Sequence, residues 1–496
     1  MVVLMVSSRT LAYQILLHIE QKASQPDRLI RTTLERHSRL DERDRALLTE
    51  LVYGVVRWQG RLDWHIDELS SIKPGRIAPA VRVLLRLALY QILFLDRVPN
   101  HAAVNDAVEI AKTSQPPHVI RFINAILREA ARRGETVGSA SRSVEILPSA
   151  SGGVDLMPFA GGSGWNWPDP RMHRAEYMAV MTSHPVWLVR KLIDEIGLEE
   201  AGLLCESNNR IAQAVFRVNV LKASCEEAME SLRSEGIEAV PSPWLDGALR
   251  ARTPRRDMTA TTAFREGWLQ AQDEASQIVS LLLAPRPGER VLDLCCGLGV
   301  KSTQIAMMMK NRGEVLSVDK SAWKLEEAQK NARRQGMTII RPLVEDVLML
   351  RPKSIGLFDR VLLDAPCTGL GTIRRKPDIK WRRNIKDPYR LSLLQKELLA
   401  HAARFLKPDG VLVYATCTVL KEECEAVALH LGESLPGLTL ESAAENLPYR
   451  CREMVSGFYY RSWPHKHDVD GFFSARYKGV RQLAKNEQCG LNRNLI

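Results

Sequence analysis

Cysteine is scarce in this 496-residue sequence. There are nine cysteines, an odd number, and no two of them form a Cys-x-x-Cys pair. A disulfide framework and a zinc ribbon both require cysteines paired at characteristic spacings, so this composition argues against both. We therefore expect a protein of a reducing compartment that binds no metal.

Long hydrophobic runs are missing as well. The most apolar stretch, residues 81–95, is interrupted by Arg82, Arg86 and Gln91, which predicts a buried amphipathic helix rather than a membrane span. The first residues, MVVLMVSS, lack the cationic start and the apolar length of a secretory signal. We expect a soluble cytoplasmic protein that does not associate with a membrane.

Charge of both signs is abundant, with a positive excess. Lys and Arg number 69 against 58 Asp and Glu, a formal net charge of +11, while 45% hydrophobic and 26% charged residues are ordinary globular values. The composition therefore excludes a disordered or fibrous chain, and the positive excess favours a polyanionic partner such as nucleic acid. At roughly 150 residues per domain, a chain of this length should fold as about three domains.

The first part of the chain is helical in pattern. Apolar residues recur at helical spacing from residue 9 to 133, which predicts an all-α bundle over residues 1–134. A run rich in Gly, Ser and Pro follows, and we interpret residues 135–172 as a flexible linker in which Trp165 and Trp167 could dock on a neighbouring surface.

The remainder mixes strand and helix patterns. Helical stripes and short β-rich runs predict a small α/β module at 173–268, and regular alternation of strands and helices predicts a doubly wound α/β domain with a parallel sheet at 269–480, followed by a tail at 481–496. The clearest strands of the doubly wound domain are 290–294, 314–319, 358–364 and 410–416.

Three of the predicted strands end in residues suited to an adenosine-type ligand. Gly297 and Gly299 follow the first strand, where a glycine turn lets a ligand approach the backbone, although a purely structural turn has the same pattern. Asp319 ends the second strand, where a carboxylate can bind a ribose diol. Asp346 follows a third and could contact adenine or cap the next helix. S-adenosylmethionine is favoured over NAD because no G-x-G-x-x-G occurs.

Two cysteines also fall at predicted strand ends. Asp364 and Cys367 lie in the loop after one strand, and Cys417 follows another. Most cysteines are inert small hydrophobes, but two beside a cofactor turn suggest chemistry. A thiolate that adds to C6 of cytosine makes C5 nucleophilic, an acid at N3 assists, and a base must later remove the C5 proton. The three residues could supply an acid, a thiol for release and a nucleophile, and spacing does not say which cysteine attacks.

With these motifs the chain resembles the RsmB-type (Sun/Fmu) family of small-subunit ribosomal RNA 5-cytosine methyltransferases. The strongest matches are DAPCTGLGTIRRKPDIKW from Asp364 and YATCT from Tyr414, and weaker ones are QDEAS, RVN and DGFF. The segments ERDRA from Glu42 and PNHAAVN from Pro99 resemble the family's N-terminal NusB-like domain. The resemblance covers nearly the whole chain outside the linker and the tail.

The resemblance implies a role for each site residue. Cys417 would be the nucleophile, Cys367 would assist release of the product, and Asp364 would contact the base. Asp319 would bind the ribose and Asp346 the adenine. The full set expected to bind the cofactor is Cys295, Cys296, Gly297, Leu298, Gly299, Val300, Lys301, Asp319, Asp346 and Asp364.

The glycine turn departs from the family's Ala-Pro-Gly-Gly-Lys pattern. Leu298 replaces the proline and Val300 replaces the second glycine, while Lys301 is kept. If the backbone at Val300 needs a positive φ, a β-branched residue there would be strained and cofactor binding weakened.

A basic run follows the cysteine loop. Six basic residues and one tryptophan lie between residues 374 and 383. Such runs are usually solvated surface, but beside a catalytic loop this one predicts RNA phosphate contacts, with Trp381 either packed in the core or stacked on a base. The residues expected to bind RNA are Arg374, Arg375, Lys376 and Lys380.

Together these patterns predict an S-adenosylmethionine-dependent enzyme that methylates C5 of a cytosine in 16S ribosomal RNA through a covalent cysteine–C6 adduct. The target base must leave its stack, so an accessible segment of RNA is the expected substrate. We expect the protein to be a monomer. One alternative is an inactive RNA-binding ribosome-assembly factor, supported only by Leu298 and Val300. Another is an amino-group RNA methyltransferase, which would leave Cys417 without a role. The N-terminal bundle would contact RNA or, alternatively, another protein.

Overall fold

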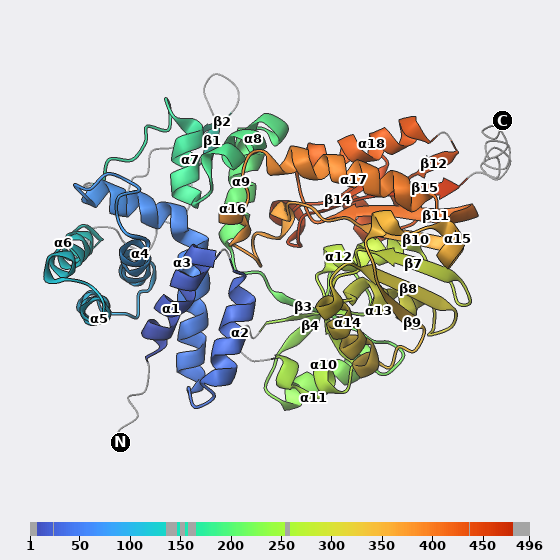
Figure 1. The fold of residues 1–496 in the computed structure, drawn as a ribbon, viewed down its shortest axis with the longest axis horizontal. Helices are drawn as coiled ribbons and strands as arrows, with labels where there is room; N and C mark the ends of the chain where they lie inside the picture. The colour runs from blue at the N-terminus through green and yellow to red at the C-terminus, as the bar shows by residue number, and fades with distance from the viewer. Residues whose placement is uncertain are drawn as a thin grey trace. The chain divides into compact units, whose positions relative to one another are not determined.

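The computed structural model describes residues 7–22, 24–134, 146–148, 154–156, 165–252, 258–435 and 437–479. Two compact units make up the chain: Met1–Arg210 with Lys376–Ile385, and Ile211–Arg375 with Lys386–Ile496 (Figure 1). Most of the predicted linker and all of the predicted tail, 481–496, lie outside the described residues. The predicted boundary at residue 173 differs from this division, because the helices up to residue 210 belong to the first unit.

The first unit is the helical bundle that the sequence predicts. Its helices are α1 (Ser8–Lys22), α2 (Pro26–Arg36), α3 (Glu42–Leu69), α4 (Pro79–Phe94), α5 (Asn100–Lys112) and α6 (Pro117–Gly134). Helix α4 is central, since it contacts α1, α3, α5 and α6. Its interrupting Arg86 is buried and donates to Asp63 and Glu20, each at 2.8 Å, so the apolar stretch is a core helix. No helix in the described ranges is both long and apolar enough to cross a membrane.

Further segments complete the first unit. They are α7 (Arg174–Thr182), α8 (Val186–Ile196), α9 (Leu198–Asn209), α16 (Ile379–Arg382) and the antiparallel pair β1 (Ile146–Pro148) and β2 (Val154–Leu156). Trp167 stacks on Trp64 of α3 with ring centroids 4.2 Å apart, and Trp165 packs edge-on against His65 at 4.3 Å. Both tryptophans therefore dock on the bundle.

The second unit begins with a small α/β module. Its four-stranded antiparallel sheet has the order β4 (Ala239–Pro241), β5 (Ala248–Ala251), β3 (Ala214–Val218), β6 (Leu269–Ala271), with helices α10 (Cys225–Ser234) and α11 (Thr262–Arg265). Ser224 and Glu227 form a capping box that starts α10. Arg217 of β3 is fully buried and donates to Val300 O at 3.0 Å and Thr303 Oγ1 at 3.0 Å, which joins the module to the next domain.

A second sheet forms the core of the larger domain, in the order β13, β14, β15, β11, β10, β7, β8, β9, with β12 also paired to β15. Strands β7 to β11 are parallel, and β15 is antiparallel to β11. Their bounds are β7 (Arg290–Leu294), β8 (Glu314–Asp319), β9 (Ile340–Val344), β10 (Phe358–Asp364), β11 (Leu406–Thr416), β12 (Leu438–Glu441), β13 (Val455–Ser456), β14 (Tyr459–Ser462) and β15 (Phe472–Gly479).

Helices cover both faces of this sheet (Figure 1). They are α12 (Glu274–Leu283), α13 (Val300–Met308), α14 (Ala322–Gln335), α15 (Pro352–Ile355), α17 (Asp387–Ala403), α18 (Glu425–Ser434) and α19 (Pro464–His467). Successive residues of β7 point to opposite faces: Val291 packs with Ile278 and Ile305, and Leu292 packs with Leu398. The doubly wound fold is confirmed, and it gathers the carboxyl ends of the parallel strands at one edge.

Candidate active site

A left-handed backbone turn follows β7. Cys295, Gly297 and Gly299 have φ of 59°, 57° and 70°. A Cβ on Gly299 would lie 2.7 Å from the Cβ of Ala328, so this glycine permits close helix packing, whereas a Cβ on Gly297 would meet open space. Gly297 is therefore the position at which a ligand can approach the backbone.

The strain predicted at Val300 does not occur. Val300 is the first residue of α13 and is not among the residues with positive φ. Within the turn 295–301, the non-glycine residue in the left-handed region is Cys295 instead. The family's second turn glycine is thus replaced at a position where the backbone of this chain is ordinary helix.

The carboxylate of Asp319 fixes the turn. One oxygen accepts from the backbone N–H of Gly297 at 3.0 Å, and the other accepts from Ser321 N–H at 2.9 Å. Asp346 caps the short 3₁₀ turn Val347–Met349 and accepts from Leu348 N–H at 3.0 Å. Capping was the alternative to adenine binding that the sequence left open for this residue. Its side chain is exposed, so the structure leaves its contact with adenine as a prediction.

Acidic side chains gather around the turn. The pKa of Asp293 is raised to about 7 by burial, partly offset by the hydroxyl of Ser302 at 2.5 Å. Lys301 Nζ contacts Asp364 Oδ2 at 2.7 Å, and although burial alone would lower the lysine's pKa, this carboxylate raises it. Asp364 and Asp293 act on Lys301, while Asp319 has Lys324 Nζ at 3.9 Å, so three acids here face two lysines, a balance of charge that suits a cationic ligand.

The two predicted cysteines lie side by side. Cys367 Sγ and Cys417 Sγ are 3.3 Å apart, a hydrogen-bond contact rather than a disulfide, because an S–S bond is about 2.05 Å long. The bond to Cys417, together with burial, raises the pKa of Cys367 well above its usual value. The fold brings them together because β10 and β11 are adjacent and parallel. Asp364 is the last residue of β10.

Two glycines hold the loop that carries Cys367. Gly371 N–H donates to Cys417 O at 3.0 Å, and Gly471 N–H donates to Gly371 O at 2.8 Å. A Cβ on Gly371 would lie 1.9 Å from Gly471 O, so only glycine fits there. The DGFF motif near the end of the chain therefore packs directly on the cysteine loop.

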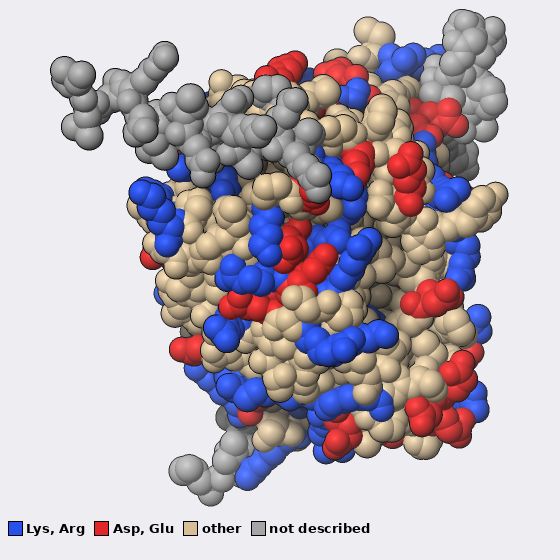
Figure 2. Space-filling model, turned by 90° about the vertical axis from the view of Figure 1, so that its right-hand side faces the viewer, with Lys and Arg blue, Asp and Glu red and all other residues tan. Residues whose placement is uncertain are grey.

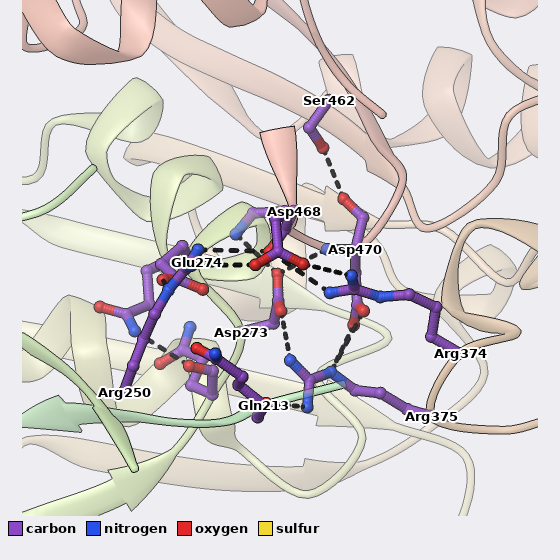
Figure 3. Close-up of polar contacts among 12 residues, drawn as sticks. Gln213, Arg250, Asp273, Glu274, Arg374, Arg375, Ser462, Asp468 and Asp470 are labelled. Atoms are coloured by element: carbon purple, nitrogen blue, oxygen red, sulfur yellow. Dashed lines mark hydrogen bonds and ion pairs between the residues drawn. The ribbon is translucent and has the colours of Figure 1, made fainter. Parts of the chain in front are cut away.

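Arg374 and Arg375 of the basic run, both predicted to contact RNA, pair with acidic side chains of the protein. Arg374 donates to Asp468 at 2.6 Å, and Arg375 donates to Asp273 at 2.6 Å and contacts Asp470 at 3.0 Å. Figure 3 shows Asp468 lying between Arg374 and Arg250, while Arg375 reaches both of its acids. These guanidinium groups neutralise the buried carboxylates of Asp273 and Asp470 and the exposed carboxylate of Asp468, so their charge is already balanced within the protein.

Lys380 and Trp381 are also structural. Lys380 is fully buried and donates to Arg57 O and Ser183 O, each at 2.7 Å, and burial lowers its pKa well below the usual value. Trp381 Nε1–H donates to Val56 O at 2.7 Å, so packing rather than base stacking is its role. Of the four predicted RNA-binding residues, Lys376 alone is exposed.

Arg375→Ala should destabilise the protein strongly. The variant would leave Asp273 and Asp470 buried without their cation, and breaking one side of a buried ion pair costs about 3–5 kcal/mol. Urea unfolding of the full chain would measure this loss. The matched control is Arg341→Ala, whose side chain is 75% exposed beside Glu314 and should cost less than about 1 kcal/mol. Equal losses in the two variants would contradict the assignment.

The geometry agrees with the comparisons to known proteins. Residues 280–478 match the family described as 16S rRNA methyltransferase RsmB/F, residues 6–132 match the NusB family, and residues 184–257 match the ferredoxin-like domain of RsmF/B-like methyltransferases. The probable ribosomal RNA small subunit methyltransferase B of Bacillus subtilis (strain 168) is 33% identical, covering 95% of this chain and 99% of the relative. That of Synechocystis is 32% identical over 96% of this chain and 100% of the relative.

Solved structures support the same fold. The crystal structure of PH0851 has a TM-score of 0.76 at 28% identity and covers 96% of this chain and 99% of its own. NSun6 from Pyrococcus horikoshii, solved with SFG, has a TM-score of 0.54 at 22% identity, covers 60% of this chain and 98% of its own, and supports the fold alone.

A doubly wound sheet with a ligand-accessible glycine turn at its carboxyl edge, together with the match of residues 280–478, defines the protein as a Rossmann-like methyltransferase. The chain belongs to the RsmB/F family of 16S ribosomal RNA methyltransferases, and the resemblance seen in its motifs is confirmed.

Proposed function

We propose that this protein methylates C5 of a cytosine in 16S ribosomal RNA through a covalent bond between Cys417 and C6 of the base. The observation that carries the proposal is the contact of 3.3 Å between Cys367 Sγ and Cys417 Sγ, beside Asp364. Transfer to an amino group needs no thiol, so that alternative gives neither cysteine a role. The inactive alternative loses its support at Val300, which is unstrained.

Covalent attack makes C5 reactive. The thiolate of Cys417 bonds to C6, N3 takes up a proton, and the electron pair of the new enamine becomes available at C5. C5 then bonds to the incoming methyl group. Removal of the C5 proton by a base lets the C6–S bond break, which returns the thiolate and, with loss of the N3 proton, the aromatic ring. The net result is one methyl group gained and one proton released.

We assign the remaining roles by position. Asp364 contacts the base at N3, and the ammonium of Lys301, 2.7 Å from its carboxylate, is the source of the proton that passes through Asp364 to N3. Cys367, which the contact with Cys417 and burial keep protonated, assists release of the methylated product. We place Cys367 at the release step rather than at the cofactor because its sulfur contacts the attacking sulfur of Cys417.

S-adenosylmethionine is the cofactor, and it supplies the methyl group as an electrophilic sulfonium. The residues at the turn fit such a group, since Gly297 leaves its backbone open and the carboxylates of Asp293, Asp319 and Asp364 favour a cation. We assign Asp319 to the ribose and Asp346 to the adenine. The segment 295–301 would line the rest of the cofactor site.

Arg374 and Lys380 are buried and Arg375 is half-buried and ion-paired, so other cations are better placed to contact RNA. Figure 2 shows one face on which Lys and Arg are interspersed with Asp and Glu, so the net charge of +11 is not concentrated in one patch there. Lys376 and the exposed Arg28 and Arg31 of α2 belong to the first unit and are candidate phosphate contacts. The NusB-like bundle would then take part in binding RNA.

Mapping of 5-methylcytosine in 16S ribosomal RNA tests the proposal. RNA from cells that lack this protein should lose 5-methylcytosine at one position, and the purified protein with labelled S-adenosylmethionine should restore it there. An unchanged 5-methylcytosine map would contradict the proposal. A lost methyl group on an exocyclic amine would keep the methyltransferase assignment and contradict the C5 chemistry.

A further inference from the structure

Glu423 is a buried carboxylate close to both cysteine loops. It ends the short 3₁₀ turn Lys421–Glu423, between β11 and α18, and its side chain is fully enclosed. An uncompensated carboxylate at such a position costs several kcal/mol, so its partners must compensate it.

Each oxygen of Glu423 is bound from the cysteine loops. Oε1 accepts from the backbone N–H of Thr368 at 2.8 Å, and Oε2 accepts from the hydroxyl of Thr368 at 2.5 Å and of Thr418 at 3.3 Å. Thr368 directly follows Cys367, and Thr418 directly follows Cys417. The two threonine hydroxyls are themselves 2.8 Å apart. One carboxylate therefore ties together the backbones that carry the two thiols.

A second layer holds Glu423 in place. Gln395 of α17 donates its amide to Glu423 Oε1 at 3.0 Å and to Pro366 O at 2.9 Å, which fixes the start of the Cys367 loop. Tyr414 of β11 donates its hydroxyl to the backbone carbonyl of Glu423 at 2.6 Å. This set of hydrogen bonds around Glu423, which we call the Glu423 clamp, connects β11, α17 and the loop after β10.

The partners of Glu423 select its ionised form. Burial raises the pKa of Glu423 above its usual value, and the hydrogen bonds that Thr368, Gln395 and Thr418 donate offset part of that rise. A carboxylate accepts from all of these groups at once, whereas a protonated acid would direct its own hydrogen at a donor. Its charge also acts on Cys367, whose pKa is raised first by the bond to Cys417, next by burial, and further by Glu423.

We propose that Glu423 is a positioning residue that keeps the thiols of Cys367 and Cys417 in contact and aligned for attack and release. This role rests on the proposed C5 chemistry, in which both thiols act on one base. Glu423 touches neither cysteine through a hydrogen bond in the structure; it acts through Thr368 and Thr418. Loss of Glu423 should lower kcat, the rate at which the enzyme–RNA complex reacts, and leave the affinity for RNA unchanged.

A matched pair of variants at Thr368 tests the clamp without emptying the core. Thr368→Val keeps the shape and removes the hydroxyl that Glu423 accepts, whereas Thr368→Ser keeps the hydroxyl. Loss of a hydrogen bond to a charged group should lower kcat about 10-fold in the valine variant, with KM for 16S RNA changed less than about threefold, and serine should restore kcat. Glu423→Ala should lower kcat about 100-fold, the effect expected when a reacting group shifts by about 1 Å.

Two controls separate positioning from stability and from the proposed function. Glu289→Gln alters a carboxylate that binds Arg360 beside the amino end of β7, and it should leave kcat unchanged. RNA made with 5-fluorocytidine has no removable C5 proton, so the wild-type protein should form an adduct with it that survives denaturation. If the wild type forms no adduct, the proposed function itself fails.

With the wild-type adduct present, the outcomes at Thr368 and Glu423 decide the positioning role. A raised KM with unchanged kcat, serine as impaired as valine, or an equal loss in Glu289→Gln would each overturn it. A selective loss of kcat that serine restores would support it, and the melting temperature of Thr368→Val checks that the fold is intact.

Discussion

Cys417→Ala will abolish methyl transfer and leave no covalent protein–RNA product, even on RNA made with 5-fluorocytidine. Without a thiolate at residue 417, nothing adds to C6, and C5 of an intact cytosine ring is too weak a nucleophile to take the methyl group. Removal of a nucleophile of this kind should lower kcat on the order of 10⁴-fold or more. Transfer of labelled methyl groups and denaturing gel electrophoresis would measure the two effects.

The matched control is Cys225→Ala. Cys225 is a half-buried cysteine that begins α10 in the small α/β module, so its loss should leave methyl transfer and adduct formation unchanged. The thiol of Cys367 remains in the Cys417→Ala variant. An adduct formed by that variant would therefore assign the attack to Cys367 and exchange the roles of the two cysteines.

The strands that carry the site were predictable because each is a largely apolar run followed within a few residues by a glycine, proline or polar turn. Three of them, 290–294, 314–319 and 358–364, match β7, β8 and β10 residue for residue. The fourth begins at residue 406 rather than 410, because Leu406 pairs with Phe358 before a register shift. Turn residues near Gly410 concealed that pairing in the sequence.

The basic run shows that a local sequence pattern does not reveal which partners its cations have in the folded protein. Arg374 and Arg375 resemble a solvated or RNA-binding cluster, and nothing nearby in the sequence indicates that Asp273, Asp468 and Asp470 neutralise them from about 95 to 102 residues away. Ion pairs of this kind are set by the tertiary fold. Charge counting therefore assigned an RNA site to a segment in which Arg374, Arg375 and Lys380 already have partners within the protein, whereas Lys376 is exposed.

Glu423 shows the converse. In the sequence it is one of two acids in Lys-Glu-Glu-Cys, a pattern typical of an exposed turn. Only the adjacency of β10 and β11 places Thr368 and Thr418 around it. The nucleophile pair was predictable from motif spacing and resemblance, whereas the carboxylate that holds the pair was not, because its partners are defined by strand order.

Cys367→Ala should trap the reaction half-way. Cys417 keeps its thiolate and can still attack, and the bonds of Glu423 to Thr368 persist because they involve neither sulfur. Release loses the thiol whose sulfur lies 3.3 Å from Cys417 Sγ, so the adduct should accumulate on unmodified RNA and survive denaturation. Turnover should fall to about one methyl group or fewer per protein, where wild-type protein turns over many times.

The Cys367→Ala, Cys417→Ala double variant is the control for this trapping, because it should form no adduct. If Cys367→Ala turned over at the wild-type rate, the contact between the two sulfurs would have no part in release. If Cys367→Ala accumulates the covalent adduct and Cys417→Ala forms none, the two thiols must act in sequence on the same base. Two cysteines that were merely packed together would give the same small loss in either variant, so the asymmetry between the single variants is the decisive measurement.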